Sequence, residues 1–366
     1  MKRHAHARAR FSRGVTLVEL MVSLVVGLIV VGAASTVFVA TSRTYASTES
    51  LGRIQENMRV AFELMARDMR ESAGNPCEKN LPLYNVIKNS TALWYTDFTT
   101  GIRGYEGTQA FADAAFGTAA GQRIAGTDAI ELKSAVSNGV AIVSHVPASA
   151  QFKVNTVNHG LFDGDLALAC DFAEAAVFQV TNAQSGTNDT IVHNPGIGTP
   201  GNCSKGLGFG TPVNCTTNGN QYAFGCYQGK FSGGGCDGDD DGVKNEAEDL
   251  WPAILAKLRA TRWYIGANGR GGRSLYQSTL RNNGGVLTVD NNEIVDGVRD
   301  LNLQYLLAGS TNYVDATAVT AADWASDKVV AVNMDLTLEG TETVGTDGQG
   351  LRRHLQLVVT IRNHAQ

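Results

Sequence analysis

Proline is scarce in this sequence, which has only 7 prolines but 41 glycines among 366 residues. A proline-rich disordered linker is therefore excluded, and a collagen-like helix is excluded because the glycines follow no strict three-residue period. Charged residues make up 18% of the chain, whereas 43% of the residues are hydrophobic. The chain is long enough for one large or two ordinary domains with a buried core, and we expect a β-rich, loop-rich globular protein.

A surplus of positive charge is also missing, since the formal net charge is −5. No nucleic-acid partner is expected, because neutralising phosphates requires a basic face. The charge is unevenly distributed: residues 1–14 hold five basic residues and no acid, and the remainder holds 25 basic and 35 acidic residues, a net charge of −10. A basic stub ahead of an acidic body predicts a targeting segment.

Catalytic signatures are missing too. The sequence has no G-x-S-x-G, no H-E-x-x-H, no P-loop and no Rossmann glycine pattern, and its seven histidines are scattered. It also lacks the C-x2-C spacing that is typical of zinc sites. We therefore expect a structural protein and no enzyme.

One long apolar segment follows the basic stub. Residues 15–40 contain a single charged residue, Glu19, and as a helix would reach about 39 Å, enough to cross a hydrocarbon core of about 30 Å. The basic residues before it place that end in the cytoplasm, so the rest of the chain is expected to be exported. Six cysteines agree with an oxidising compartment.

Three interpretations of this segment compete. It is a plain signal anchor, a secretory signal cleaved after residues 31–33, or a segment in which Glu19 has a function. An acidic residue costs roughly 2.5–3.5 kcal/mol at the bilayer centre, so a segment that only inserts would avoid one. Thr16 and Glu19 match a T-x-x-E capping box, which explains the acid locally but does not explain the Arg13-Gly14 pair before it.

The run Arg13-Gly14-Val15-Thr16-Leu17-Val18-Glu19-Leu20 resembles the class III signal of type IV pilins and type II secretion pseudopilins. The resemblance implies that residues 1–14 are a leader, that a prepilin peptidase cleaves between Gly14 and Val15, and that Val15 is then N-methylated. It also implies that Glu19 is needed for assembly. Most family members have Phe where Val15 stands, a departure that bears on methylation more than on cleavage.

A physical argument supports this role for Glu19. Cleavage would leave Val15 with an α-amino group that is cationic below a pKa of about 8, and Glu19 lies roughly 6 Å further along the helix. Each charge alone is costly in lipid, but the carboxylate of one subunit beside the amine of its neighbour offsets both costs. We hypothesise that this pairing sets the axial register of subunits in a filament.

An amphipathic stretch over residues 41–74 continues the helix. Its apolar residues recur at helical spacing, and the stripe consists of Leu51, Ile54, Met58, Phe62, Met65 and Met69. Gly74 and Pro76 predict the end of a helix that starts at residue 15 and is roughly 85 Å long. We expect most of the stripe to feed the core of its own domain; the alternative is packing on neighbouring subunits.

Strand patterns fill the globular domain, residues 75–366. The predicted strands are 128–136, 140–146, 164–169, 176–181, 262–266, 274–280, 285–289, 297–306, 328–338 and 355–362. A long N-terminal helix packed on a mainly antiparallel sheet is an α+β arrangement, and it agrees with the type IV pilin-like fold that the resemblance implies.

The order of several runs resembles the PilW-type minor pilins, relatives of the J-type pseudopilins. These runs are 164–168, 177–181, 262–265, 274–276, 295–298, 303–305, 351–353 and 360–363. The resemblance implies a low-abundance subunit that helps to prime pilus assembly and sits at or near the tip. Its implied partners are other minor pilins, the major pilin, prepilin peptidase, the inner-membrane assembly platform and membrane lipid. The implied location is the bacterial inner membrane, with a periplasmic C-terminal domain, and then the pilus.

Two other functions stay open: a tip pseudopilin of a type II secretion system, and a calcium-dependent tip adhesin that displays an insertion at residues 194–250. The adhesin rests on a cysteine-rich, glycine-rich stretch that lacks the apolar residues to order itself. Six cysteines allow 15 disulfide connectivities. Pairing of sequence neighbours would join Cys203 to Cys215 and Cys226 to Cys236, leaving Cys77 with Cys170.

An acidic loop directly after Cys236 matches the calcium-binding pattern D-x-D-x-D-G-x5-E. Its carboxylates are hard oxygen ligands, and Gly242 permits a sharp turn. The predicted ligands are Asp237, Asp239, Asp241, the Val243 carbonyl, Asn245 and a bidentate Glu248. We expect a helix from Ala247 to Ala260 after the loop, starting near Pro252 or kinked there. The alternative is a solvated acidic loop without an ion.

Overall fold

The computed structural model describes residues 14–73, 76–77, 81–196, 198–208, 222–340, 342–343 and 349–361. The chain divides into two compact units. The first consists of Met1–Arg53 and Gly340–Leu351, and the second of Ile54–Glu339 and Arg352–Gln366. The leader predicted at residues 1–14 lies outside the described residues, except for Gly14.

One continuous helix, α1 (Leu17–Glu71), confirms the long N-terminal helix predicted from the sequence. Up to Arg53 it belongs to the first unit, and from Ile54 to the second. It ends close to the predicted stop, where Ala73 takes a left-handed conformation with φ 53° and the Ser72 hydroxyl donates to the Met69 carbonyl. The side chain therefore satisfies one of the carbonyls that a helix end leaves unpaired.

The part of α1 that belongs to the second unit supplies core residues. Ile54, Met58, Met65 and Met69 are all buried, as are the small residues of the same face, Ala61 and Ala66. The apolar stripe from Ile54 onward therefore packs mainly within its own unit.

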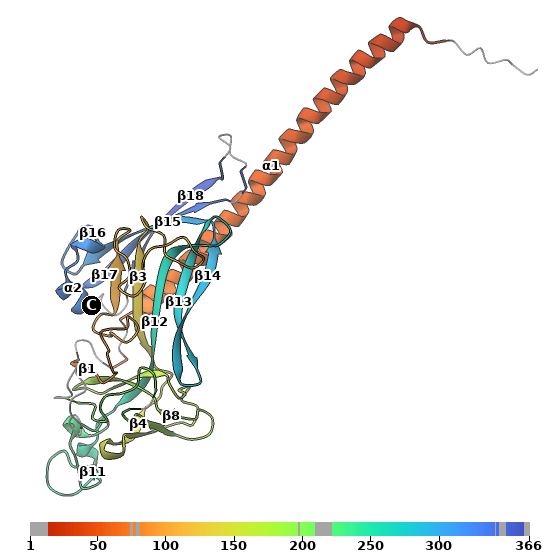
Figure 1. Ribbon diagram of the computed structural model, residues 1–366. Helices are drawn as coiled ribbons and strands as arrows, with labels where there is room; N and C mark the ends of the chain where they lie inside the picture. The colour runs from red at the N-terminus through yellow and green to blue at the C-terminus, as the bar shows by residue number, and fades with distance from the viewer. Residues whose placement is uncertain are drawn as a thin grey trace, which may run out of the picture. The chain divides into compact units, whose positions relative to one another are not determined.

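The main sheet of the second unit is built around β12, which has partners along both edges. Its neighbours are β3 along one edge and β6 followed by β13 along the other, and all three pairings are antiparallel. β7 and β1 extend the sheet beyond β6, β2 pairs with β3, and β14 pairs with β13 (Figure 1). The strands are β1 (Leu83–Asn85), β2 (Ile102–Tyr105), β3 (Ala129–Val136), β6 (Leu166–Cys170), β7 (Ala175–Gln179), β12 (Ile254–Ala267), β13 (Arg273–Asn283) and β14 (Val286–Asp296).

Three smaller sheets complete the second unit, in the orders β16-β15-β17-β18, β4-β5-β9-β8 and β10-β11. Their strands are β4 (Ile142–Val146), β5 (Gln151–Val154), β8 (Asn182–Ala183), β9 (Thr190–Val192), β10 (Phe231–Ser232), β11 (Gly235–Cys236), β15 (Val298–Leu307), β16 (Tyr313–Asp315), β17 (Val329–Glu339) and β18 (Arg352–Thr360). The short helices are η1 (Pro147–Ser149), η2 (Tyr227–Gly229), η3 (Ala247–Asp249), η4 (Ala316–Ala318) and α2 (Ala321–Ala325). A long helix with mostly antiparallel sheets confirms the α+β, pilin-like arrangement.

The helix predicted over Ala247 to Ala260 is wrong. The structure has only the three-residue turn η3 there, and β12 starts at Ile254. Leu258 and Ala260 are buried while Arg259 between them is exposed, which is the alternation of a strand. Strand partners on both sides of β12 therefore override the helix propensity of this segment, a tertiary effect that local sequence does not reveal.

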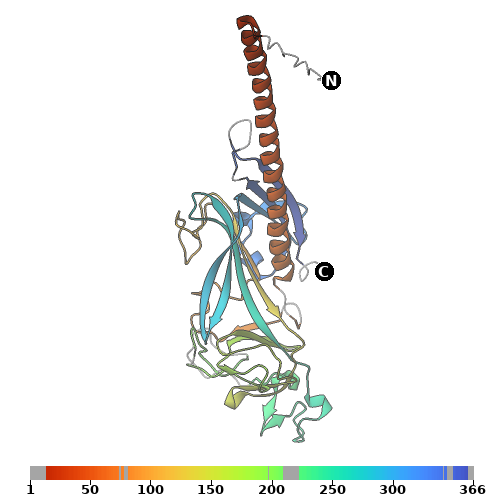
Figure 2. The same cartoon turned by 90° about the vertical axis from the view of Figure 1, so that its right-hand side faces the viewer.

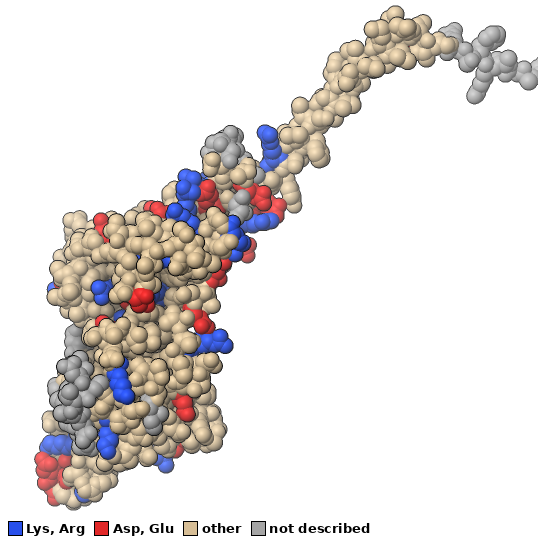
Figure 3. All heavy atoms as spheres, viewed as in Figure 1, with Lys and Arg blue, Asp and Glu red and all other residues tan. Residues whose placement is uncertain are grey.

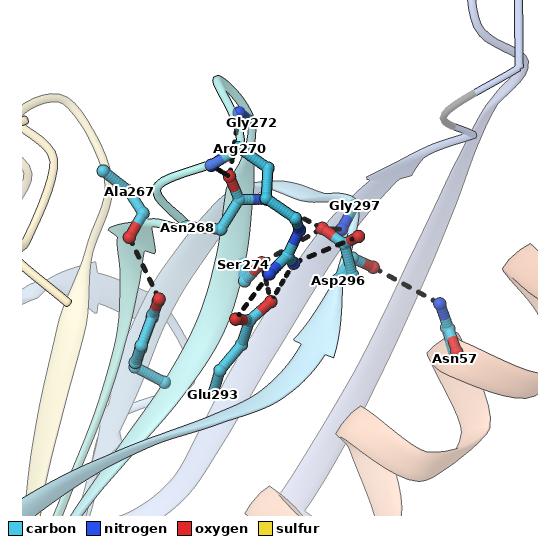
Figure 4. A network of polar contacts seen from close by, with 10 residues as sticks. Asn57, Ala267, Asn268, Arg270, Gly272, Ser274, Glu293, Asp296 and Gly297 are labelled. Atoms are coloured by element: carbon cyan, nitrogen blue, oxygen red, sulfur yellow. Dashed lines mark hydrogen bonds and ion pairs between the residues drawn. The ribbon is translucent and has the colours of Figure 1, made fainter. Parts of the chain in front are cut away.

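Polar contacts fix the end of α1 against the main sheet. The Asp68 carboxylate accepts hydrogen bonds from Trp263 Nε1 of β12 at 3.0 Å and from Gln277 Nε2 of β13 at 2.9 Å. About three turns earlier on the same face of α1, the Asn57 amide donates to the Asp296 carbonyl of β14 at 3.3 Å (Figure 4). These bonds hold the helix across three neighbouring strands.

Two disulfides are present among the described residues, and both are pairings that the sequence predicts. Cys77, six residues after α1, bonds to the buried Cys170 of β6. Cys226 bonds to Cys236 directly before the acidic loop. Cys215 lies outside the described residues, so its pairing with Cys203 stays a prediction.

Two fully buried histidines face each other in the core of the second unit. The Nε2 atoms of His145 and His193 are 3.1 Å apart, and both rings pack against Phe152. The Phe224 N–H donates to His145 Nδ1, so His145 carries its hydrogen on Nε2 and donates it to His193. Burial lowers the pKa of both imidazoles, that of His193 to about 3.

Acid is expected to destabilise the protein through this pair. An unfolded histidine binds a proton below a pKa of about 6.5, whereas the buried pair stays neutral, so the free energy of unfolding falls as the pH drops below about 6.5. For His193, with a folded pKa of about 3, the expected loss between pH 7 and pH 4 is roughly 3 kcal/mol. Urea unfolding of His193→Phe should show a shallower pH dependence, while His354→Gln on exposed β18 should match wild type. Equal slopes for all three proteins would refute the assignment.

Candidate functional site

The predicted cleavage site lies at the start of α1. Gly14 and Val15 precede the helix, and the Val15 side chain is exposed. Thr16 and Glu19 form a reciprocal capping box, in which the Glu19 N–H donates to Thr16 Oγ1 at 3.2 Å and the Thr16 N–H donates to Glu19 Oε2 at 3.0 Å. This geometry defines where the helix starts and fixes the Glu19 carboxylate beside it.

The first part of α1 exposes a nearly continuous apolar surface. Its large hydrophobic side chains between Val15 and Val39 are 47–75% exposed, and this stretch shows no Lys or Arg in Figure 3. By length and composition the helix is capable of crossing a membrane, with a mean hydropathy of 2.5 over its most apolar window. Soluble monomers rarely expose such surfaces, so lipid or other subunits are required to cover this one.

Comparison with known proteins identifies this segment. Residues 9–35 match the family described as the prokaryotic N-terminal methylation motif. No curated protein matches the chain. The chain therefore carries the class III signal of the type IV pilin and pseudopilin superfamily at its N-terminus, as its sequence predicts.

The motif has direct consequences for the class of protein. It implies processing by a prepilin peptidase and a role in the context of pilus assembly. Together with a membrane-capable helix, it is consistent with an inner-membrane or pilus location. A chain with this signal is expected to be a structural protein and not an enzyme.

A second candidate site is the acidic loop that follows Cys236. Carboxylate oxygens of Asp237, Asp239 and Asp249 lie within 4.8 Å of one another, and such a group could hold a metal ion. Asp237 and Asp249 are buried, whereas Asp239 is exposed. In Figure 3, acidic side chains gather where Figure 1 shows β11.

The backbone of the loop explains this convergence. Gly242 has φ 87°, a conformation that glycine adopts at no steric cost, and its N–H points to Asp237 Oδ1 at 3.4 Å. The Asp239 carboxylate accepts the Asp241 N–H, and the Asp241 carboxylate accepts the Val243 N–H. The loop backbone therefore curves around the point where these carboxylates converge.

The structure brings together only part of the predicted ligand set. Asp237 and Asp239 belong to the acidic group, but the residue that closes it is Asp249, which the pattern did not include. Glu248 is exposed, and Asn245 uses its amide oxygen to accept the Cys236 N–H at 3.0 Å. The Asp249 carboxylate accepts the Gly238 N–H of the loop and, within the capping box of η3, the Glu246 N–H. In the sequence, the E-x-x-D spacing of Glu246 and Asp249 is the signal from which this position of Asp249 could have been predicted.

Electrostatics around the loop favour a cation. Partial desolvation and the nearby carboxylates of Glu248 and Asp241 raise the pKa of Glu246. The Lys230 ammonium offsets some of the negative charge, because it bonds to Asp240 and to the Gly238 carbonyl at 2.7 and 2.8 Å. A divalent ion would relieve the remaining repulsion between carboxylates.

Proposed function

We propose that this chain is a PilW-type minor pilin, a structural subunit that takes part in priming and assembling a type IV pilus and sits at or near its tip. The observation that carries the proposal is the N-terminal methylation motif at residues 9–35 on an exposed apolar helix. The α+β domain and the order of the runs from residue 164 to residue 363 support the PilW branch. The proposed partners are other minor pilins, the major pilin and the inner-membrane assembly platform.

The proposed maturation starts with cleavage between Gly14 and Val15. Val15 then becomes the N-methylated terminus, and Glu19 pairs with the terminal amine of a neighbouring subunit. The capping box supports this role, because it keeps the Glu19 carboxylate within one turn of the new terminus.

Mass spectrometry of the mature N-terminus tests this proposal. We expect the protein to begin with N-methyl-Val15, as a prepilin peptidase and its methyltransferase activity would leave it. A start at Ala34 would indicate ordinary secretion, and an intact Met1 would indicate a plain signal anchor. Either result would overturn the pilin assignment.

We further propose that the acidic loop binds calcium, with Asp237, Asp239 and Asp249 as side-chain ligands and Asp241, the Val243 carbonyl, Asn245 and Glu248 as candidates to complete the shell. The donors are all oxygens, the ligand type that calcium prefers. The Cys226–Cys236 disulfide and the paired backbones of Cys236 and Asn245 close the base of the loop. A closed base lowers the entropy cost of ordering the ligands.

Calcium should therefore raise the thermal midpoint of the purified full chain at millimolar concentration. Asp249→Asn should remove most of this calcium-dependent increase, because Asp249 lies in the acidic group. Glu248→Gln tests the ligand that the sequence pattern predicts, and the increase should persist in this variant if Asp249 closes the site in its place, since Glu248 is exposed. A midpoint that does not respond to calcium would refute the site. If only Glu248→Gln loses the calcium-dependent increase, the closing ligand is Glu248, as the sequence pattern predicts.

The acidic loop also supports the second candidate function, a calcium-dependent tip adhesin. Deleting residues 194–250 is not a clean test, because this segment contributes to the core. Asn202 exchanges two 2.7 Å hydrogen bonds with Gln179 of β7, and Leu207 and Phe224 are fully buried. The combined substitution of Asp237, Asp239 and Asp249 by Asn is sharper: loss of piliation would favour assembly, and normal pili with lost adhesion would favour the adhesin. Genes for secretion components next to this one would instead favour the type II secretion pseudopilin.

A further inference from the structure

The strand β18 forms an open edge of the four-stranded sheet. Among the described residues it pairs with β17 alone, in a register that runs from Glu339↔Arg352 to Ala331↔Thr360 without a bulge. Most edge strands are protected by short length, bulges, proline or inward-facing charges. β16, at the other edge of this sheet, has only three residues, and β14, at an edge of the main sheet, pairs with a register shift. β18 has nine residues, no proline and no register shift.

The backbone groups that face outward can be identified. The Ile361 N–H donates to the Val330 carbonyl at 2.9 Å, and bonded pairs alternate along an antiparallel ladder. The odd-numbered residues of β18 therefore bond to β17. The even-numbered residues turn their N–H and C=O groups to the open edge, and these are Arg352, His354, Gln356, Val358 and Thr360.

The apolar layer of the sheet is incomplete at this edge. Leu355 and Leu357 lie opposite Leu336 and Met334 of β17, both fully buried, but are themselves only half-buried. A further strand beside β18 would cover their exposed halves. Burying apolar area in this way stabilises a contact.

The charged residues of β18 indicate which side chains the added strand would carry. Arg352 bonds to Glu339, but exposed Arg353 has no ion pair among the described residues. A carboxylate on the added strand opposite Arg353 would pair with it, since opposite charges on adjacent strands stabilise each other.

Geometry excludes a second β18 related by a two-fold axis. Within the second unit, residues 54–71 of α1 and β18 run in roughly the same direction in Figures 1 and 2. Antiparallel pairing of two β18 strands would reverse one of the two helices, whereas subunits anchored in one membrane must keep their helices parallel. An antiparallel second copy of β18 is therefore ruled out as the added strand.

We infer that β18 accepts an extended strand from a neighbouring subunit of a different sequence, with apolar residues against Leu355 and Leu357 and a carboxylate opposite Arg353. The source of this strand rests on the proposed function, since only a co-assembling subunit is held beside the chain. The open edge of β18 and its outward N–H and C=O groups do not depend on the proposed function.

Site-specific photo-crosslinking in cells tests the inference. The full chain carries a photo-reactive amino acid in place of Val358, which is 52% exposed on the open edge. We expect a crosslink to an extended segment of another subunit that bears the N-terminal methylation motif, mapped by mass spectrometry. Gln356→Pro removes one outward N–H and should lower the crosslink roughly tenfold, while Gln356→Ala keeps that N–H and should retain it.

A charge reversal guards against misfolding of the proline variant. Arg353→Glu leaves the backbone intact and should also lower the crosslink, whereas Arg281→Glu, at an exposed position of β13, should not. Thermal unfolding of each purified variant reports its folding. Equal crosslinking in wild type, Gln356→Pro and Arg353→Glu, or no crosslink in wild type, overturns the inference. The N-terminus of the same samples is sequenced: a processed chain without the crosslink overturns this inference alone, and an unprocessed chain with it overturns only the proposed function.

Discussion

Glu19→Ala is expected to lower the amount of this protein in pili roughly tenfold or more, while leaving the protein in the inner membrane with its leader cleaved. The carboxylate is the only charged side chain between residues 15 and 40, and without it the terminal amine of a neighbouring subunit would enter the apolar filament core unpaired. An unpaired charge in such surroundings costs several kcal/mol. Immunoblots of sheared pili and of membranes measure the amount of the protein in pili relative to the amount in the inner membrane.

Two further variants separate the charge of Glu19 from its capping role. Glu19→Gln keeps an oxygen that accepts the Thr16 N–H but has no charge, so it should fail like the alanine variant. Glu49→Ala removes an exposed carboxylate from the same helix, where its ion pair among the described residues is with Arg53 one turn later, and should assemble normally. Normal assembly of Glu19→Gln would show that capping alone is required.

Gly104→Ala is expected to destabilise the second unit by about 3 kcal/mol, at the upper end of what overpacking usually costs. A Cβ atom at position 104 would lie 2.2 Å from the Tyr305 hydroxyl and 2.4 Å from its Cζ. Tyr305 is fully buried and packs edge-to-face on Trp324, so it cannot move aside. Because Gly104 belongs to β2 and Tyr305 to β15, the clash would separate the main sheet from the four-stranded sheet.

Gly52→Ala is the matched control, because it introduces the same methyl group with the opposite expected effect. A Cβ atom at position 52 meets nothing within 4 Å, and the residue lies inside α1. Alanine should therefore stabilise the helix by about 0.5–1 kcal/mol. Urea unfolding of the detergent-solubilised chain compares both variants. A Gly104→Ala protein as stable as wild type would show that the two sheets do not meet as described.

The local signals in the sequence are strong enough to predict α1 and at least part of every long strand. Helical periodicity placed Met58, Met65 and Met69 in the core, and period-two patterns marked strands such as β3 and β17. The short strands β5 and β9 are not predicted, because three or four residues carry too little pattern. The first half of β12 was misassigned for a different reason: its ladder partners are more than 80 residues away in sequence.

The two functional sites differ in how far their residues could be predicted. The N-terminal signal is contiguous, so its order of residues is sufficient, and the match at residues 9–35 agrees with it. The acidic loop is also contiguous, but its closing residue depends on how η3 turns, and the chain presents Asp249 where the pattern expects Glu248. The His145–His193 pair could not be predicted, since the two residues are 48 positions apart and meet only through the fold.

The Cys77–Cys170 disulfide has a mechanical consequence. Any tension between α1 and the C-terminal strands passes through this covalent link, because it joins the chain just after the helix to β6 and spans a sequence separation of 93 residues. The chain between the two cysteines carries none of that load, and about 300 Å of contour length cannot be drawn out. A pull on α1 would therefore load β6 and the neighbouring β12 directly, and reduction of this bond would turn a nearly inextensible tether into one that lengthens under force.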